Sequence, residues 1–240
     1  MYGKLRERNV YSRHPGSLYR IFVRLGYCRK AESTKKKSKH LGKYDTPAKL
    51  GVKWQMDVKY VPKACYVGRD DEVFFQYTMI EEASQKRFIY AYKEQSSFST
   101  VDFVKRAITF FGYAPQIIQT DNGCEFCHTA KTKRVHPLKL FCAENGIAHK
   151  TIRPRTPWHN GKVERSHRND QERFYNHLCF YSLDDLQLQM KRFLRRSNNI
   201  PMSVLGWKSP NLRQQELSNA GNMPSPLPFS GLTSLTNGHV

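Results

Sequence analysis

The chain has 240 residues, enough for one or two domains, and its 39% hydrophobic and 12% aromatic content favours a globular fold. Its 40 Lys and Arg against 20 Asp and Glu give a net charge of +20, which predicts a polyanionic partner, with nucleic acid first and an anionic membrane surface as the rival. No stretch approaches the roughly 20 apolar residues of a membrane span, and no charged-then-apolar leader opens the chain. With six cysteines expected to be reduced, these features predict a soluble cytoplasmic protein.

The positive charge is concentrated at the front of the chain. Residues 1–53 contain 15 Lys and Arg and 3 Asp and Glu, so they carry +12 of the +20. Within them, residues 14–27 predict a short helix with Ser17 as its cap and Gly26 at its end. A polar, basic linker follows this helix. Residues 1–53 are therefore the part of the chain expected to attract a polyanionic partner most strongly. The alternative is a solvated tail without a specific partner.

The middle of the chain predicts a mixed sheet with helices packed on it. The first expected strand alternates apolar with polar residues, as a half-buried strand does. The first three strands are close enough to be hairpin neighbours, whereas the later ones alternate with helices and favour parallel additions. The expected strands are 54–60, 74–80, 87–92, 116–119 and 147–150, and the expected helices run from Ser99 to Gly112, from 138 to 145, from Thr156 to about 175, and from Ser182 onward.

Three acidic residues occupy unusual positions. Asp57 is in the middle of a strand and faces away from its apolar residues, Asp121 follows a strand in a polar turn, and Glu164 lies on a helix among basic neighbours. A central strand, the end of its neighbour and a helix across that edge can bring the three carboxylates together. Converging carboxylates repel one another unless a cation neutralises them, and hard oxygen ligands select Mg²⁺ or Mn²⁺. Taken singly, Asp121 also suits a turn and Glu164 a helix ion pair.

The sequence around these acids contains three motifs. The stretches WQMDVKYVP, IIQTDNGCEF and RPRTPWHNGKVERSHRNDQERFY follow one another along the chain. They resemble the integrase core of bacterial insertion-sequence transposases, which is kin to retroviral integrases, and the resemblance runs from about Lys49 to Leu217. It implies an α/β, RNase H-like fold with a mixed five-stranded sheet flanked by helices. It also implies that Asp57, Asp121 and Glu164 are the catalytic DDE triad and hold two Mg²⁺ or Mn²⁺ ions per active site.

The resemblance implies an activity and partners. The activity is metal-dependent DNA strand cleavage and strand transfer by a polynucleotidyl transferase, which cuts the ends of a mobile element and joins them to target DNA. Because such enzymes synapse two DNA ends, the resemblance implies a homo-oligomer. It also implies a location in the bacterial cytoplasm at the nucleoid, without a membrane partner. The residues expected to contact DNA are Asn122, His159, Asn160, Lys162, Arg165 and Arg168, with a solvated lysine as the alternative for Lys162.

Several features depart from the family pattern. Between Asp121 and Glu164 lie 164 − 121 − 1 = 42 residues, a longer gap than is usual, which predicts an insertion in the 124–137 loop. The usual N-terminal module is also longer, so the alternative function is a truncated, non-catalytic DNA-binding relic or an inhibitor of the full-length transposase. An RNase H-type nuclease fits the metals but not the third motif. The expected domains are a basic N-terminal segment with a partial helix-turn-helix remnant and linker at 1–45, the catalytic core at 46–217, and a disordered tail at 218–240.

The cysteines offer weaker signals. Residues 124–128, CEFCH, match the attachment pattern of c-type haem, but this stretch overlaps the polar turn after Asp121 and no export signal accompanies it. The same two cysteines, with Cys142, His136 or His149, are an alternative zinc site, although no second Cys-x-x-Cys pair occurs.

Overall fold

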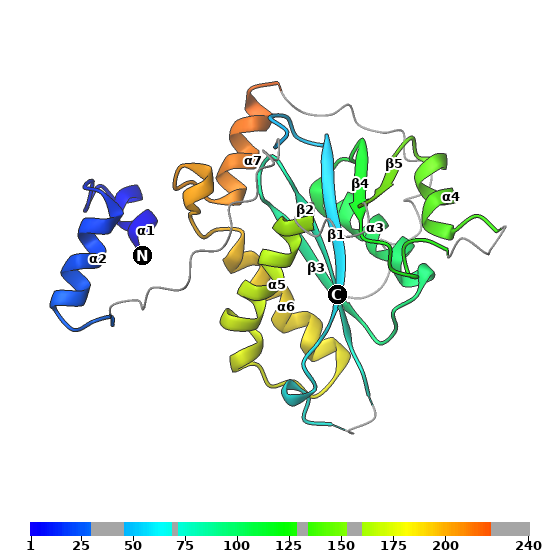
Figure 1. Ribbon diagram of the computed structural model, residues 1–240, viewed down its shortest axis with the longest axis horizontal. Helices are drawn as coiled ribbons and strands as arrows, with labels where there is room; N and C mark the ends of the chain where they lie inside the picture. The colour runs from blue at the N-terminus through cyan, green and yellow to red at the C-terminus, as the bar shows by residue number, and fades with distance from the viewer. Residues whose placement is uncertain (30–45, 69–71, 129–133, 153–159, 222–240) are drawn as a thin grey trace, which may run out of the picture.

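The computed structural model describes residues 1–29, 46–68, 72–128, 134–152 and 160–221, and a five-stranded mixed sheet lies at its centre (Figure 1). The strand order is β3-β2-β1-β4-β5. The first three strands pair antiparallel, and β1–β4 and β4–β5 pair parallel. The sequence prediction of a mixed sheet built from hairpin neighbours and parallel additions is confirmed. The strands are β1 (Lys53–Tyr60), β2 (Phe75–Glu81), β3 (Arg87–Tyr92), β4 (Ile117–Thr120) and β5 (Ala148–Thr151).

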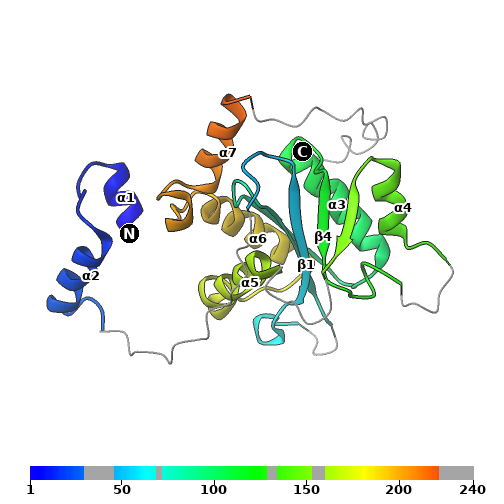
Figure 2. The same ribbon diagram turned by 45° about the horizontal axis from the view of Figure 1, so that its top comes forward.

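Helices cover both faces of the sheet. Figure 2 shows α3 and α4 on one side of the strands and α5 and α6 on the other. Short 3-10 helices at 63–65, 175–177 and 203–205 join these elements. No helix of the described residues has the length and apolar character of a membrane span. The helices are α1 (Tyr2–Glu7), α2 (Pro15–Arg24), α3 (Ser97–Phe111), α4 (Pro137–Glu144), α5 (Gly161–Arg173), α6 (Leu183–Ser197) and α7 (Pro210–Asn219).

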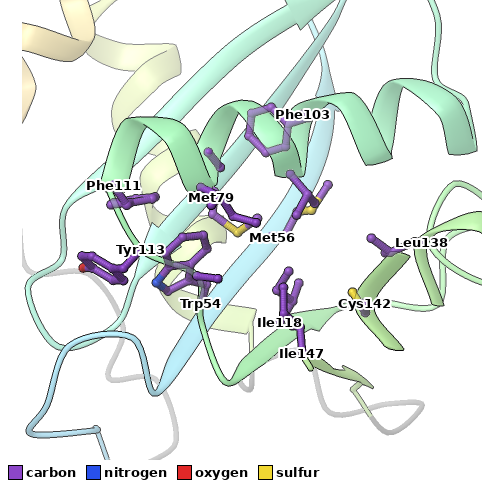
Figure 3. Packing of buried hydrophobic residues seen from close by; sticks show 14 of the residues in the cluster. Trp54, Met56, Met79, Phe103, Phe111, Tyr113, Ile118, Leu138, Cys142 and Ile147 are labelled. Carbon is purple, nitrogen blue, oxygen red and sulfur yellow. The ribbon is translucent and has the colours of Figure 1, made fainter. Parts of the chain in front are cut away.

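The two faces of the sheet have different chemistry. The face under α3 and α4 is apolar, and Figure 3 shows Trp54 and Met56 of β1 packed against side chains of both helices. The Trp54 ring is fully buried, and its centroid lies 4.5 Å from that of Phe111. A second apolar cluster lies between β3 and α6, around Ile89 and Met190. Each fully buried side chain of this size stabilises the fold by about 1.5–3 kcal/mol, so these two clusters anchor the sheet.

Two helices, α2 and α3, are capped by residues other than the predicted ones. Ser96 rather than Ser99 caps α3, because its hydroxyl accepts the backbone N–H three residues on at 3.1 Å. His14 rather than Ser17 caps α2, through Nδ1 and the N–H two residues on at 3.1 Å. A capping side chain must stand just outside the helix to reach these N–H groups, and both sequence choices lay inside it. The predicted cap Ser182 of α6 is confirmed.

Both ends of the chain contain a helix that the sequence analysis missed. Helix α1 lies against the segment before α7: the ring centroids of Tyr2 and Trp207 are 4.5 Å apart. Helix α7 continues to Asn219, past the expected start of the tail at 218. The predicted helix start at Thr156 lies outside the described residues, and α5 begins at Gly161.

Candidate active site

Asp57 and Asp121 lie on neighbouring parallel strands. β1 and β4 pair with Gln55 opposite Gln119, so the same register carried two residues further sets Asp57 against Asp121, just past the end of β4. Neighbouring strands are about 4.8 Å apart. Asp121 Oδ1 accepts a hydrogen bond from the N–H of Gly123 at 2.9 Å, a turn that Asp favours. The sheet therefore brings the first two predicted acids to one place.

Glu164 comes from the helix that covers this face of β1. It is exposed in the first turn of α5. Two polar contacts tie the start of the helix to the strand: Val163 N donates to Gln55 Oε1 at 3.3 Å, and Asn160 Nδ2 donates to the carbonyl oxygen of Met56 at 3.4 Å. Asp57 and Gln55 share a face of β1 because side chains alternate along a strand, so α5 begins beside Asp57.

The charges of these acids act on one another. The pKa of Asp57 is raised to about 7, first by burial and then by the negative charge of Asp121, with smaller contributions from Glu164 and Glu125. A hydrogen bond from the N–H of Val58 opposes this rise. Carboxylates that raise one another's pKa repel each other when ionised, and a bound divalent cation would offset this repulsion. The residues present therefore fit a metal ion in their chemistry and in their mutual influence.

The coordination shell is not closed in this structure. In the parts of the chain that it describes, no three His, Cys, Asp or Glu side chains are grouped tightly enough to hold a metal ion. The same finding applies to the alternative zinc site, where Cys124, Cys127 and Cys142 are free thiols. The structure thus gathers the three predicted acids in one region without setting their oxygens around one point.

Glu125 is a site carboxylate that the sequence analysis did not single out. It is 6% exposed, and its Oε1 accepts a hydrogen bond from Gln95 Nε2 at 2.6 Å. A Cβ added at Gly123 would lie 2.5 Å from Glu125 Oε2, so a larger residue in the turn would require this carboxylate to shift. Its place two residues after that glycine was visible in the second motif, but its burial was not.

Two expected DNA contacts are engaged within the protein. Lys162 Nζ lies 3.3 Å from Glu82 Oε2, a fully buried carboxylate, and also donates to Thr46 Oγ1 at 3.1 Å. Asn160 is only 2% exposed and is held against β1. Each side chain satisfies a polar group of the sheet or its border, and their contact with DNA stays a prediction. The solvated alternative for Lys162 does not match this structure, because its ammonium group is paired with a buried carboxylate.

The remaining expected contacts differ among themselves. Asn122 is exposed, but its Nδ2 donates to the carbonyl oxygen of Ile152 at 3.0 Å and so joins the turn to the end of β5. Arg165 and Arg168 are exposed on α5. Arg165 directly follows Glu164, and Arg168 lies four residues after Glu164, one turn further along the same side of the helix. His159 lies outside the described residues.

A buried polar network, missed from the sequence, joins α5 to the sheet. Asp170 is fully buried, and its Oδ1 lies 2.6 Å from Arg87 Nη1 on β3. Its Oδ2 accepts a hydrogen bond from Gln76 Nε2 on β2 at 2.8 Å. The Tyr175 hydroxyl donates to the Oε1 of the same glutamine. Buried charges need such partners, since an unpaired one is strongly destabilising.

His167 connects this network to the acids. Its Nδ1 lies 3.5 Å from Asp57 Oδ2, and its Nε2 lies 3.0 Å from Thr78 Oγ1. Burial lowers the pKa of His167 to about 4, so the imidazole is neutral near pH 7.

Comparison with known proteins identifies the class. A family model described as the integrase core domain matches residues 47–157, and a second model with the same description matches residues 145–210. Together with the mixed sheet flanked by helices, these matches define an RNase H-like integrase catalytic core. The chain belongs to the integrase core domain family, and this membership supports a function of the integrase or transposase type.

Individual relatives agree with this assignment. The chain is 34% identical over 125 residues to the ORF3 protein of Spiroplasma virus SpV1-C74, inferred to be an integrase; the match covers 48% of this chain and 34% of that protein, so the chain spans about a third of its length. The HTLV-2 integrase catalytic core domain in complex with magnesium aligns with a TM-score of 0.52 at 22% identity, over 69% of this chain and 97% of that one. The simian T-cell lymphotropic virus intasome in complex with PP2A regulatory subunit B56 gamma aligns with a TM-score of 0.56 at 16% identity, over 98% and 80%. At these identities the two structures show the shared fold.

Proposed function

We propose that the chain catalyses DNA strand cleavage and strand transfer with two Mg²⁺ or Mn²⁺ ions held by Asp57, Asp121 and Glu164. The observation that carries this proposal is the arrangement of the acids: Asp57 lies on β1, Asp121 directly follows the neighbouring parallel strand β4, and α5, with Glu164 in its first turn, begins beside Asp57. In agreement with this, the charges of both other acids help to raise the pKa of Asp57 to about 7. Membership of the integrase core domain family supports it. So does the magnesium in the HTLV-2 integrase core, which has the same fold.

The chain's own residues have distinct parts in this reaction. Asp57 and Asp121 are each fixed by a backbone N–H at 2.9 Å, so the sheet presents two oriented carboxylates, and α5 adds Glu164. The bound ions would activate the attacking oxygen and stabilise the leaving one. Arg165 and Arg168, which are exposed on the same helix, would bind phosphates of the DNA.

The chemistry needs no nucleophile from the protein. In cleavage, a water oxygen bonds to phosphorus while the bond from phosphorus to the departing 3′ oxygen breaks, and that oxygen leaves as a 3′-hydroxyl. In transfer, this hydroxyl loses its proton and attacks a phosphorus of the target strand, whose own 3′ oxygen is displaced. One phosphoester bond forms for each that breaks, so the joining step needs no external energy source.

The same proposal includes partners and organisation. We propose that the basic segment at 1–45 helps to hold DNA, that residues 46–217 carry the chemistry, and that at least two copies assemble to bring two DNA ends together. The excess of positive charge in residues 1–53 supports the first point. For the third, the HTLV-2 core has been solved in dimeric and trimeric forms and the simian virus protein in an intasome.

The proposal is tested by Mn²⁺-dependent nicking and joining of supercoiled plasmid. Glu164→Gln removes one charge of the triad, and Glu172→Gln is the matched control because it makes the same change at an exposed position of α5. We expect Glu164→Gln to lose both activities while it binds DNA as the wild type does, and Glu172→Gln to keep them. Full activity in Glu164→Gln would contradict the triad. A folded, DNA-binding wild type without activity would favour the non-catalytic relic or inhibitor.

A further inference from the structure

A continuous chain of polar contacts runs from the buried ion pair under α5 to the first acid of the triad. Asp170 Oδ2 accepts from Gln76 Nε2 at 2.8 Å, and the same Nε2 lies 2.9 Å from Thr78 Oγ1. Thr78 Oγ1 lies 3.0 Å from His167 Nε2, and His167 Nδ1 lies 3.5 Å from Asp57 Oδ2. Thr78 stands directly opposite Asp57 in the pairing of β1 with β2, so the histidine ring on α5 spans both strands.

The chemistry of Asp170 and Gln76 fixes the direction of the first hydrogen bonds in this chain. A carboxylate paired with Arg87 only accepts, so Gln76 must present its NH₂ group to Asp170, and its Oε1 is left to accept from the hydroxyl of Tyr175. The second N–H of that NH₂ group donates to the oxygen of Thr78. The threonine hydroxyl hydrogen is then free to be donated onward to an acceptor.

The order of donors favours one tautomer of the histidine. When Thr78 donates its hydroxyl hydrogen to His167 Nε2, the ring proton is on Nδ1. That N–H would lie 3.5 Å from Asp57 Oδ2, slightly beyond a normal hydrogen bond, and a small shift of the ring or the carboxylate would close it. The other oxygen of Asp57 accepts from the N–H of Val58 at 2.9 Å. The carboxylate therefore has one backbone donor and one histidine nitrogen beside it, and the remaining lone pairs of both oxygens are available to an ion.

We propose that His167 is a positioning residue, held by Thr78 in the tautomer that aims an N–H at Asp57 and so fixes the carboxylate in the orientation that a divalent ion requires. This inference rests on the proposed metal site of Asp57, Asp121 and Glu164. His167 is three residues from Glu164 and thus on the same side of α5. Groups that orient a metal ligand in this way commonly change metal affinity by about 10- to 100-fold when removed.

The test compares Mn²⁺ binding by variants of the full chain, measured as free Mn²⁺ by electron paramagnetic resonance. Thr78→Val keeps the shape of the side chain and removes the hydroxyl, and Thr78→Ser is the matched control that retains it. We expect Thr78→Val to weaken Mn²⁺ binding roughly 10-fold and Thr78→Ser to bind as the wild type does. Thermal unfolding of each variant shows that the protein compared is folded.

A second background separates positioning from a general structural role. His167→Asn keeps an N–H donor close to the position of Nδ1 and does not depend on the threonine hydroxyl. In that background, Thr78→Val should change Mn²⁺ affinity less than about 2-fold. If Thr78→Val does not fold, His167→Phe keeps a ring without donors and should show the same 10-fold loss relative to His167→Asn.

Each outcome bears on a different claim. If the wild type binds Mn²⁺, Asp57→Asn abolishes that binding and Thr78→Val leaves it unchanged, the positioning role is overturned and the metal site stands. An equal loss from Thr78→Val in both backgrounds overturns it as well, because the hydroxyl then acts through the fold. A wild type that binds no Mn²⁺ overturns the proposed metal site, and the positioning role with it.

Discussion

The buried ion pair of Arg87 and Asp170 allows a quantitative test of how α5 is held on the sheet. Asp170→Asn keeps the size of the side chain and removes its charge. The guanidinium of Arg87, whose side chain is 9% exposed, would stay buried without its carboxylate partner. The new amide would also point its NH₂ group at one of two donors, the guanidinium or Gln76 Nε2, where the carboxylate accepts from both.

The expected loss follows from this burial. Removing one partner of a buried ion pair costs roughly 3–5 kcal/mol, because the other charge is left uncompensated. In the side-chain hydrogen bonds that remain, Arg87 donates to the uncharged hydroxyls of Ser166 and Ser197, which do not replace the carboxylate. In a chain of this size each kcal/mol lowers the melting temperature by about 2–4 °C. Asp170→Asn should therefore melt roughly 6–20 °C below the wild type.

The measurement is urea unfolding followed by tryptophan fluorescence, for which the fully buried Trp54 is a reporter. Asp184→Asn makes the same chemical change at an exposed position in the first turn of α6 and should cost less than about 1 kcal/mol. A loss below about 1 kcal/mol for Asp170→Asn would refute the reasoning, because it would mean that water reaches Arg87. Replacing both partners by apolar residues should recover most of the loss.

Four further substitutions have defined outcomes. The pKa of Asp57 is about 7 in the folded protein and 3.8 for an unperturbed aspartate, so the folded state binds more protons between these values and loses stability as pH rises from about 4 to about 7. In EDTA at pH 8, Asp57→Asn should therefore unfold at a higher urea concentration than the wild type, and this difference should shrink toward pH 4. A Cβ at Gly3 would lie 2.4 Å from Pro201 Cβ, so Gly3→Val should displace α1 and speed tryptic cleavage of residues 1–29, with an unchanged unfolding midpoint for the core. Lys162→Ala should lower the urea midpoint of unfolding, because it removes one partner of the buried Glu82 carboxylate. Arg168→Ala should leave stability unchanged and should reduce the slope of log binding constant against log salt concentration by about 0.9.

Much of the sheet was predictable because its strands follow simple patterns. The alternation along β1 predicted its two faces, and β3 has the predicted bounds, Arg87 to Tyr92. Helix α7 was missed because its apolar residues form no stripe, and only Leu217 and its first residue, Pro210, are buried. Helix α1 has six residues and is too short to show a period. Both helices depend on contacts with distant segments, which a local pattern does not contain.

In the candidate site, too, the features set by local sequence were predicted and those set by contacts between distant residues were missed. The motifs predicted which elements carry the three acids, and the register of β1 with β4 places two of them side by side. The motifs did not reveal that Lys162 is paired with Glu82, 80 residues away, or that Asn160 is buried. The sequence shows a charge but not its partner, so side chains on the α5 motif were assigned to DNA as a group. Glu125 and Asp170 were missed for the same reason, since burial of a carboxylate is decided by the tertiary structure.

The way α5 is attached connects the fold to the proposed chemistry. Its buried residues are Val163, Ser166 and Asp170, so the helix has little apolar surface to bury and is held mainly by hydrogen bonds and an ion pair. Hydrogen bonds depend on direction as well as distance, whereas apolar contacts tolerate sliding. A polar interface therefore fixes the helix in one position along β1 and β2. Glu164 is on this helix and Asp57 is on β1. The hydrogen bonds and the Arg87–Asp170 ion pair that hold α5 therefore also determine how far apart these two carboxylates lie.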